Sequence, residues 1–229
     1  MKIIQTILLF LITFSFINCE ENTKPENFPY ETGTVKDIDG NVYTTVNIGD
    51  QWWMAENLRV THYQNQDAIE KISNSEDWFR LNNSGKDAYC YYDNNENYLD
   101  EFGCLYNWIA VADNRNIAPQ GWRIPSNEDW EKLIQYPKKN NEDTFKSENG
   151  WIDFRYGGGT DDFGFNALPA GWVTREFVNM GSLTIFWSET EYDENSAWHL
   201  RLDNSYSTNE LQYSDKYYGF SVRCVKDAN

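Results

Sequence analysis

The sequence predicts an α+β fold in which strands outnumber two short helices. Short runs of alternating apolar and polar residues, rich in valine, threonine and aromatic side chains, recur between glycine- and asparagine-rich turns. Only two segments, beginning at Cys104 and Ser126, carry apolar residues at helical spacing. For a chain of 229 residues, a single domain of about 200 residues is the simplest organisation.

The start of the chain is predicted to be an export signal. Residues 1–18 contain one lysine and a short apolar run, too short to span a membrane as a stable helix. The five residues ending at Cys19 resemble a bacterial lipobox, although Asn18 departs from its strict form, and Glu20 and Glu21 resemble the signal for the outer face of the outer membrane. We therefore expect Cys19 to be acylated and to hold the protein in outer-membrane lipid, facing the cell exterior. The alternative is an ordinary secretory signal.

Residues 19–32 are predicted to be a flexible tether. They are polar, contain Pro25 and Pro29, and show no periodicity. No second hydrophobic stretch follows in the sequence. Residues 33–229 are then expected to form one domain that only the lipid attaches to the membrane.

An antiparallel β-meander is predicted at the start of this domain. Residues 34–38 and 42–48 alternate apolar and polar side chains, and the turn between them is centred on Gly40. Residues 51–54 begin a third strand after a second glycine turn. These segments are close enough in sequence to pair with one another.

A calcium loop is the alternative interpretation of the first turn. Asp37, Asp39 and Asn41 have the spacing of the first ligands of such a loop, but Ile48 stands where the twelfth-position glutamate is needed. A plain turn is therefore predicted. The oxygen-rich segment 93–97 is also interpreted as a turn, with a bound cation such as calcium as the alternative. No metal or other cofactor is predicted.

The middle of the chain is predicted to be mostly loop. Residues 61–87 are polar, with a short helix expected around 78–79, and residues 87–92 form a short aromatic strand. Residues 104–112 are predicted to be helical and to pack beside the helix that begins at Ser126. The apolar face of this helix consists of Leu105, Trp108, Ile109 and Ala112.

The most strongly specified element is the helix that follows Pro125. Ser126 can cap its first turn, and Asp129 can complete a short version of the capping box. Pro137 ends the helix because proline lacks an N–H and clashes with the preceding turn. The apolar stripe that faces the core consists of Trp130, Leu133 and Ile134.

The C-terminal third is predicted to return to strands. Residues 138–149 read as loop, and residues 163–172 alternate small and bulky side chains, which suits a tightly packed bend. Strands are predicted at 184–188, 197–202 and 218–225.

The composition of the chain indicates which residues build its core and which class of partner is excluded. The chain has 10 tryptophans, and large apolar rings default to the interior, so an aromatic core is predicted, with exposed stacking platforms for sugars as the alternative. The formal charge is −17, and removing residues 1–18 takes away one lysine and no acid, which makes it −18. Phosphate backbones repel such a chain, so nucleic acid is excluded as a partner.

Several motifs occur together in the order known from one family. These segments are residues 39–43, 51–58, 105–108, 119–126, Trp130, 164–169, 186–191 and 221–227. On these segments the chain, from about residue 34 to its end, resembles the Fibrobacter succinogenes major paralogous domain (FISUMP). That family occurs in surface and secreted proteins of Bacteroidetes and Fibrobacteres, and its function is poorly defined.

A second resemblance implies a more specific fold. Residues 121–131 and 219–223 are similar to two motifs of formylglycine-generating-type domains. Those domains have a C-type-lectin-like fold, which implies twisted antiparallel sheets with two short helices and long irregular loops. Their activity needs two cysteines near the C-terminus, where only Cys224 stands, and the calcium-dependent sugar-binding triplets of C-type lectins are missing from the sequence. We therefore expect neither formylglycine-generating activity nor calcium-dependent sugar binding of that kind in this chain.

The remaining cysteines are candidates for a disulfide, which export favours. Cys90–Cys104 is the first expectation and Cys104–Cys224 the second. The family resemblance implies a cysteine just before Pro119, where this chain has Ala118, so the usual family pairing does not transfer.

The candidate functional residues are the two histidines, a pair of glutamates and two tryptophans. His62 and His199 have no His or Cys partner at metal-ligand spacing, so no zinc site is predicted. The paired carboxylates of Glu189 and Glu191 are the best candidates for acid–base chemistry, but sequence adjacency supplies no cleft between them. The residues predicted to contact a ligand are Trp187, Glu189, Glu191 and Trp198.

The sequence therefore predicts a lipid-anchored cell-surface domain that binds an extracellular polysaccharide or protein without catalysis. The first alternative is an extracellular polysaccharide hydrolase that uses paired carboxylates. The second is a structural surface protein or adhesin scaffold.

Overall fold

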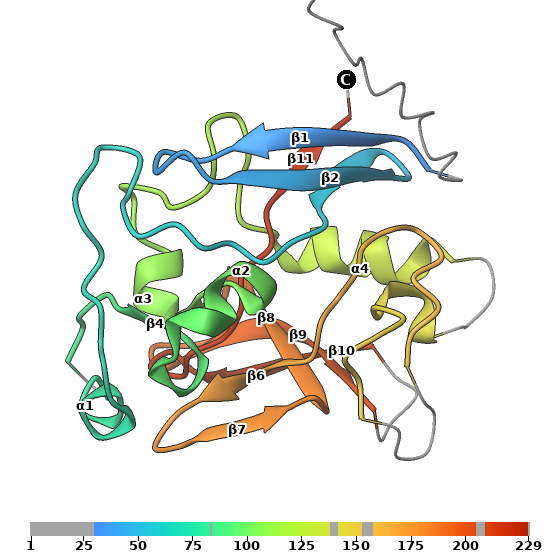
Figure 1. The fold of residues 1–229 in the computed structure, drawn as a ribbon. Coiled ribbons are helices and arrows are strands. Elements are labelled where there is room, and N and C mark those ends of the chain that lie inside the picture. The colour runs from blue at the N-terminus through green and yellow to red at the C-terminus, as the bar shows by residue number, and fades with distance from the viewer. Residues whose placement is uncertain (1–29, 83, 138–141, 153–157, 205–208, 229) are drawn as a thin grey trace, which may run out of the picture.

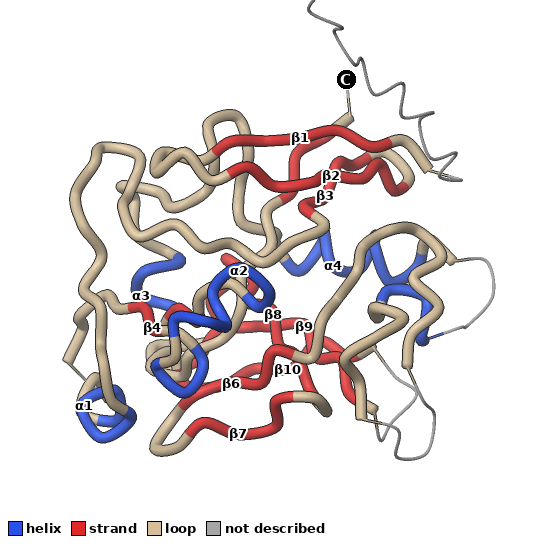
Figure 2. The backbone as a smooth tube through the Cα atoms, in the orientation of Figure 1, coloured by secondary structure: helices blue, strands red, loops and turns tan. Residues whose placement is uncertain are grey.

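The computed structural model describes residues 30–82, 84–137, 142–152, 158–204 and 209–228. The export signal, Cys19 and the tether up to residue 29 lie outside the described residues. The described part folds into two main sheets with short helices between and beside them (Figure 1). Long loops connect most of these elements, as the tan segments of Figure 2 show. The α+β class is confirmed.

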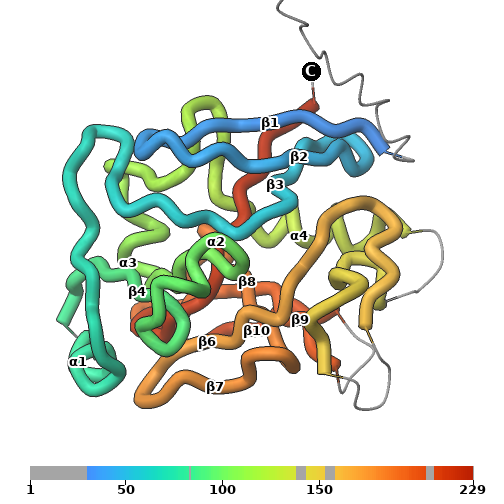
Figure 3. The backbone as a smooth tube through the Cα atoms, in the orientation of Figure 1, coloured from blue at the N-terminus to red at the C-terminus, as the bar shows by residue number. Residues whose placement is uncertain are grey.

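The first sheet contains the predicted meander. Its strand order is β1-β2-β3-β11, and all its pairs are antiparallel. The β1–β2 hairpin closes at Gly40, whose φ of 91° is the left-handed conformation that glycine adopts without strain. The C-terminal strand returns beside β3, which brings the two ends of the domain together (Figure 3). The strands are β1 (Thr32–Lys36), β2 (Val42–Ile48), β3 (Gln51–Met54) and β11 (Val225–Asp227).

The second sheet has the order β10-β9-β8-β6-β7. The strands predicted at 184–188 and 197–202 are confirmed as parts of β8 and β9, while β6, β7 and β10 are additions that the sequence did not predict. The β6–β8 pair is parallel and the others are antiparallel. The strands are β6 (Ala170–Val173), β7 (Phe177–Met180), β8 (Leu183–Glu191), β9 (Ser196–Asp203) and β10 (Glu210–Asp215).

The helix predicted over 104–112 is correct only in its second half. Leu105–Tyr106 form strand β5, which pairs with β4 (Tyr89–Cys90), and α3 (Trp108–Val111) begins after Asn107 caps its first turn. The Tyr106 backbone also pairs with Phe220, so long-range strand partners override the local helical periodicity. The other short helical elements are α1 (Ser75–Phe79), η1 (Tyr92–Asn94), η2 (Glu96–Tyr98), α2 (Leu99–Phe102) and η3 (Glu142–Phe145).

Helix α4 (Asn127–Gln135) joins the two sheets. Its capping box is confirmed, because Ser126 Oγ accepts from the Asp129 N–H at 3.2 Å and the Asp129 carboxylate accepts from the Ser126 N–H at 2.8 Å. The Trp130 ring lies 4.9 Å from that of Trp53 in β3 and 5.9 Å from that of Phe186 in β8, centroid to centroid. One buried tryptophan thus contacts both sheets.

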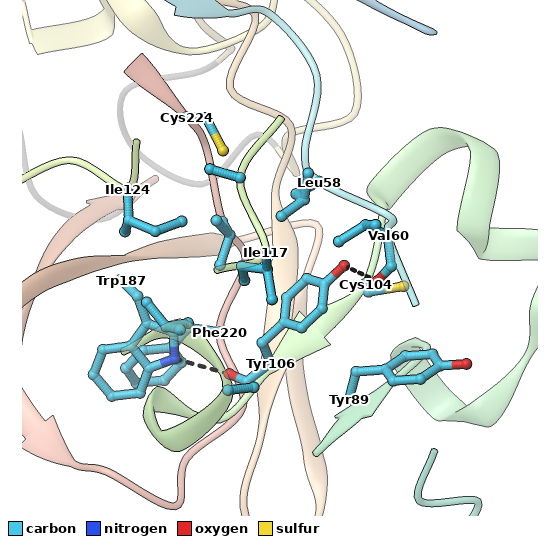
Figure 4. Packing of buried hydrophobic residues seen from close by; sticks show 14 of the residues in the cluster. Leu58, Val60, Tyr89, Cys104, Tyr106, Ile117, Ile124, Trp187, Phe220 and Cys224 are labelled. Carbon is cyan, nitrogen blue, oxygen red and sulfur yellow. Dashed lines mark hydrogen bonds between the residues drawn. The ribbon is translucent and has the colours of Figure 1, made fainter. Parts of the chain in front are cut away.

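The core is built from aromatic rings, as predicted. Seven of the ten tryptophans are buried, all within the described residues. On β8, Phe186 belongs to the cluster around Trp130, whereas Trp187 belongs to a second cluster on the other face of the sheet. Figure 4 shows the second cluster, in which Tyr106 donates a hydrogen bond from its hydroxyl to the Val60 carbonyl at 2.6 Å. The five-stranded sheet is therefore covered on both faces.

The strand predicted over 218–225 is an extended connection between the sheets. Its residues form single bridges to several partners, such as Gly219 to Val173 and Ser221 to Phe186, before β11 joins the first sheet. No helix among the described residues has the length and apolarity needed to cross a membrane.

Candidate functional site

The predicted ligand-contacting residues all lie on the β8–β9 hairpin. Its turn is held by Asp193, whose Oδ1 accepts from the N–H groups of Asn195 at 2.9 Å and Ser196 at 2.8 Å. These hydrogen bonds, the one from Asn195 first, lower the pKa of Asp193. The β8–β9 register shifts between Trp187 and Glu191, after which Glu191 at the end of β8 pairs with Ala197.

The prediction for Trp187 is corrected by the structure. Its side chain is fully buried, its indole N–H donates to the Tyr106 carbonyl at 2.8 Å, and its ring lies 4.3 Å from that of Phe220 (Figure 4). Trp187 is therefore a core residue that an external ligand does not reach.

Trp198, which is half-buried, belongs to an aromatic cluster at the turn end of the hairpin, which we call the aromatic platform: Tyr192, Trp198 and Tyr213. The rings of Tyr192 and Tyr213 stack with centroids 3.8 Å apart and planes 6° from parallel. Trp198 lies opposite Tyr213 in the β9–β10 register and meets both tyrosines edge-on, at 5.3 and 5.7 Å. Tyr192 is 44% exposed and Tyr213 is 52% exposed.

The ion pair of Glu191 lies at a first cleft beside the same hairpin, which we call the Lys216 cleft. Its carboxylate pairs with the ammonium of Lys216, which also donates to the Glu194 carbonyl at 2.7 Å. The Lys216 side chain is only 12% exposed and lies over the Trp108 ring at 4.8 Å. A cleft of about 470 Å³ opens here, with a lining that includes Asn82, Glu194, Asn195, Asp215, Lys216 and Tyr217.

Glu189 lines a second cleft of about 410 Å³, with Arg123, Asp113 and Thr190 among its other walls. Burial raises the pKa of Glu189, and the charge of Asp129 adds to the rise while Arg123 opposes it. The Arg123 guanidinium is itself held by Asp129 at 3.0 Å and by Asp227 at 2.8 Å.

Glu189 and Glu191 therefore have different partners. Glu189 faces the cleft of Arg123, whereas Glu191 is neutralised by Lys216, which lines the other cleft. The hydrolase alternative would need the two carboxyl groups to face one shared groove, and these two residues do not share one.

The predicted disulfides are not formed. Cys90, Cys104 and Cys224 are buried free thiols. Cys90 lies opposite Leu105 in the β4–β5 register and shares its apolar cluster, while Cys104, one position earlier, belongs to a different cluster. Cys104 precedes β5, so the pairing of β4 with β5 places Leu105 and not Cys104 opposite Cys90. Cys19 lies outside the described residues.

The histidines and the candidate calcium turn have local partners. His62 Nδ1 lies 2.7 Å from Asp39 Oδ1, and Asp37 accepts from the Asn41 backbone at 2.9 Å and the Tyr43 hydroxyl at 2.6 Å. Buried His199 contacts the Ser214 hydroxyl at 3.0 Å; burial, and secondarily Arg201, lowers its pKa to about 3. Within the described ranges, no group of three or more His, Cys, Asp or Glu side chains is arranged to hold a metal ion.

Sequence reasoning missed Tyr192, Tyr213 and Lys216. Tyr192 directly follows the predicted Glu191, and Tyr213 lies in β10, whose Leu211 and Tyr213 alternate with polar neighbours. That alternation is the signal that could have identified the strand. The pairing of β10 with β9 then brings Tyr213 beside Trp198.

Comparison with known proteins gives one match. The profile of the Fibrobacter succinogenes major domain family covers residues 46–226. Neither the curated proteins nor the solved structures contain a match to the chain.

Proposed function

The chain belongs to the Fibrobacter succinogenes major domain family, and from this premise we propose that it is a lipid-anchored cell-surface domain that binds an extracellular polysaccharide or protein without catalysis. The observation that carries the proposal is the aromatic platform. Exposed apolar side chains that gather in one patch, unlike ones scattered singly, often mark a binding site. The tyrosine pair is both exposed and ordered by Trp198, so its geometry exists before any ligand arrives.

The finer fold assignment is part of the proposal. A C-type-lectin-like domain is supported by the antiparallel sheets, the long connections and the capped helix α4 between the sheets. In such a frame the loops and hairpin ends carry the variable binding surface. The aromatic platform and both clefts beside β8 lie at such positions.

Anchoring through Cys19 accounts for how a domain with these properties reaches its ligand. The apolar leader, the cysteine that follows it and Glu20-Glu21 support an acylated protein on the outer face of the outer membrane. The high negative charge supports solubility of the exposed domain and disfavours anionic lipid surfaces and nucleic acids as ligands.

Non-catalytic binding is preferred over hydrolysis because of the surroundings of the acids. The Glu191 carboxylate is held by Lys216, and Glu189 lines a separate cleft beside Arg123. A hydrolase would need one carboxyl group to give a proton and another to act across the same bond.

The test uses the full chain expressed with its own leader. We expect palmitate labelling of the protein and its digestion by protease added to intact cells, with both lost in Cys19→Ala. The acylated protein, purified in detergent, is then screened against arrays of polysaccharides and of extracellular proteins. Retention of a ligand without the release of new reducing ends supports the proposal. A labelled protein that binds nothing on either array, or one that cleaves a polysaccharide, contradicts it.

A further inference from the structure

We propose that the aromatic platform and the Lys216 cleft together bind an uncharged polysaccharide, which lies across the end of the β8–β9 hairpin. This inference rests on the proposed binding function and names its ligand class and its site. The observation behind it is a flat, exposed tyrosine stack beside a polar cleft that shares the same hairpin turn.

The stacking geometry favours a ligand with a flat surface over a cation that would insert between the rings. Aromatic cages for quaternary ammonium groups surround the cation with ring faces. Here the rings of Tyr192 and Tyr213 lie 3.8 Å apart, which leaves no space between them for a ligand. A side-chain hydrogen bond with Tyr213 raises the pKa of Tyr192. Stacking covers the inner face of each ring, so a ligand can meet only an outer ring face, which is flat and apolar and suits the C–H face of a sugar ring.

The charges around the platform select an uncharged polymer. Residues 191–195 and 210–216, around the hairpin turn and along β10, carry one base, Lys216, and five acids: Glu191, Asp193, Glu194, Glu210 and Asp215. That base is largely buried and paired with Glu191, so it offers little positive charge to an anionic ligand. Carboxylates accept hydrogen bonds from sugar hydroxyls but repel uronate, sulfate and phosphate groups.

The cleft supplies the hydrogen-bonding half of the site. Glu194 and Asn195 lie in the hairpin turn next to Tyr192, and Asp215 is two residues beyond Tyr213. Tyr217 adds an aromatic side chain to the lining, and Asn82 adds an amide. Few polar groups beside apolar rings are the usual composition of a small-molecule or sugar subsite. A polymer bound on the platform can therefore continue into the cleft around one turn.

The experiment measures binding of the full acylated chain to soluble xylan, mixed-linkage β-glucan, galactomannan and amylose, with polygalacturonate and tetramethylammonium as charged comparators. We expect at least one uncharged polymer to bind and its affinity to fall by about tenfold or more in Tyr213→Ala and in Tyr192→Ala, as for a central aromatic contact. Tyr213→Phe keeps the stack and is expected to stay within about threefold of the wild type. Tyr136→Ala removes an equally exposed tyrosine (45%) at the end of α4 and serves as the matched control.

The outcomes separate this inference from the proposed function. Thermal unfolding confirms that each variant is folded, and the use of two tyrosine positions keeps the test valid if one of them destabilises the domain. Preference for polygalacturonate or tetramethylammonium, or polysaccharide binding that neither alanine variant reduces, overturns the inference. Binding of a protein but of no polysaccharide overturns the inference and leaves the proposed function standing. Binding of nothing at all overturns both.

Discussion

Arg223 donates its Nε hydrogen to Asn57 Oδ1 across 2.7 Å, joining residues that are 166 positions apart. The guanidinium is fully buried, and three of its other hydrogens go to the carbonyls of Met54 (2.9 Å), Phe165 (2.6 Å) and Asn166 (3.0 Å). A cation in the connection between the two sheets is thus satisfied largely by backbone oxygens. Burial lowers its pKa to about 9, so it stays charged at neutral pH.

Replacing Arg223 with methionine is expected to destabilise the fold strongly. Methionine fills part of the volume but leaves Asn57 Oδ1 and three carbonyls without a donor, which we expect to cost about 3–5 kcal/mol in the free energy of unfolding. Urea unfolding of the two proteins measures the difference. Arg80→Ala, at a side chain that is 65% exposed, is the control and should change stability by less than about 0.5 kcal/mol. Equal midpoints for Arg223→Met and the control would show that the buried network contributes nothing.

Asp129 is expected to make stability depend on pH in the acid range. Burial acts to raise the pKa of Asp129, but hydrogen bonds from Ser126, Arg123 and Gln51 outweigh it, so the pKa lies below its ordinary value. A lowered carboxyl pKa contributes stability above the unfolded value of about 3.9 and loses it as pH falls through the folded value. Asp129→Asn should therefore cost about 2 kcal/mol at pH 7 and progressively less below pH 4.

Denaturant unfolding from pH 7 to pH 2.5 measures this difference for Asp129→Asn. Glu128→Gln alters an exposed carboxylate in the same first turn and is the matched control, with an expected cost below about 0.5 kcal/mol at pH 7. A gap between wild type and Asp129→Asn that stays constant down to pH 2.5 would contradict the assignment.

Asp161 is expected to make stability depend on pH in the direction opposite to that of Asp129. Burial raises its pKa to about 6, against which the Asn166 N–H bond and the charge of Arg223 work. A raised carboxyl pKa favours the protonated folded state, so its contribution is present below the unfolded value of about 3.9 and is lost as pH rises through about 6. In Asp161→Asn the amide oxygen can still accept from the Asn166 N–H. The amide does not ionise, so the variant does not lose stability at this site as pH rises.

We therefore expect Asp161→Asn to match the wild type at pH 4 and to exceed its stability at pH 8 by roughly 1 kcal/mol, a value reduced for solvent screening at this partly exposed site. Asparagine also tolerates the left-handed backbone of residue 161, whose φ is 43°. Urea midpoints at the two pH values test the sign. A variant less stable than the wild type at pH 8 would show that the ionised carboxylate is favourable.

The thiols are expected to be unreactive until the domain unfolds. Cys90, Cys104 and Cys224 are buried, and burial raises the pKa of each thiol, so few thiolates form at neutral pH. Ellman titration of the native, unreduced protein acylated at Cys19 should detect no fast thiol, and titration of the same protein in denaturant should detect three. Cys90→Ser should lower the denatured count by one. A count of one thiol in denaturant would show that two of the three cysteines form a disulfide, and it would contradict the prediction.

The elements that the sequence predicted correctly depend on neighbours close in the chain. The meander of β1, β2 and β3 needs only short turns, and α4 is defined by the capping box at its start and Pro137 after its end. The misassigned segment, Leu105–Tyr106, has helical periodicity but pairs with β4 and Phe220. The candidate site followed the same division: Trp198 packs against the exposed tyrosines and Glu191 precedes Tyr192, whereas Trp187 is buried and Tyr213 comes from a strand that was not predicted.

By itself the sequence determined the family, the α+β class, the aromatic core and the capped helix, because motif order, composition and capping depend on residues that are neighbours along the chain. Only the tertiary structure decided which aromatic rings are available to a ligand. Exposure depends on which strand lies beside which, and the same β8 strand buries Trp187 within the sheet core and ends beside exposed Tyr192. The pairing of β10 with β9 then completes the stack by bringing Tyr213 against Tyr192 and Trp198.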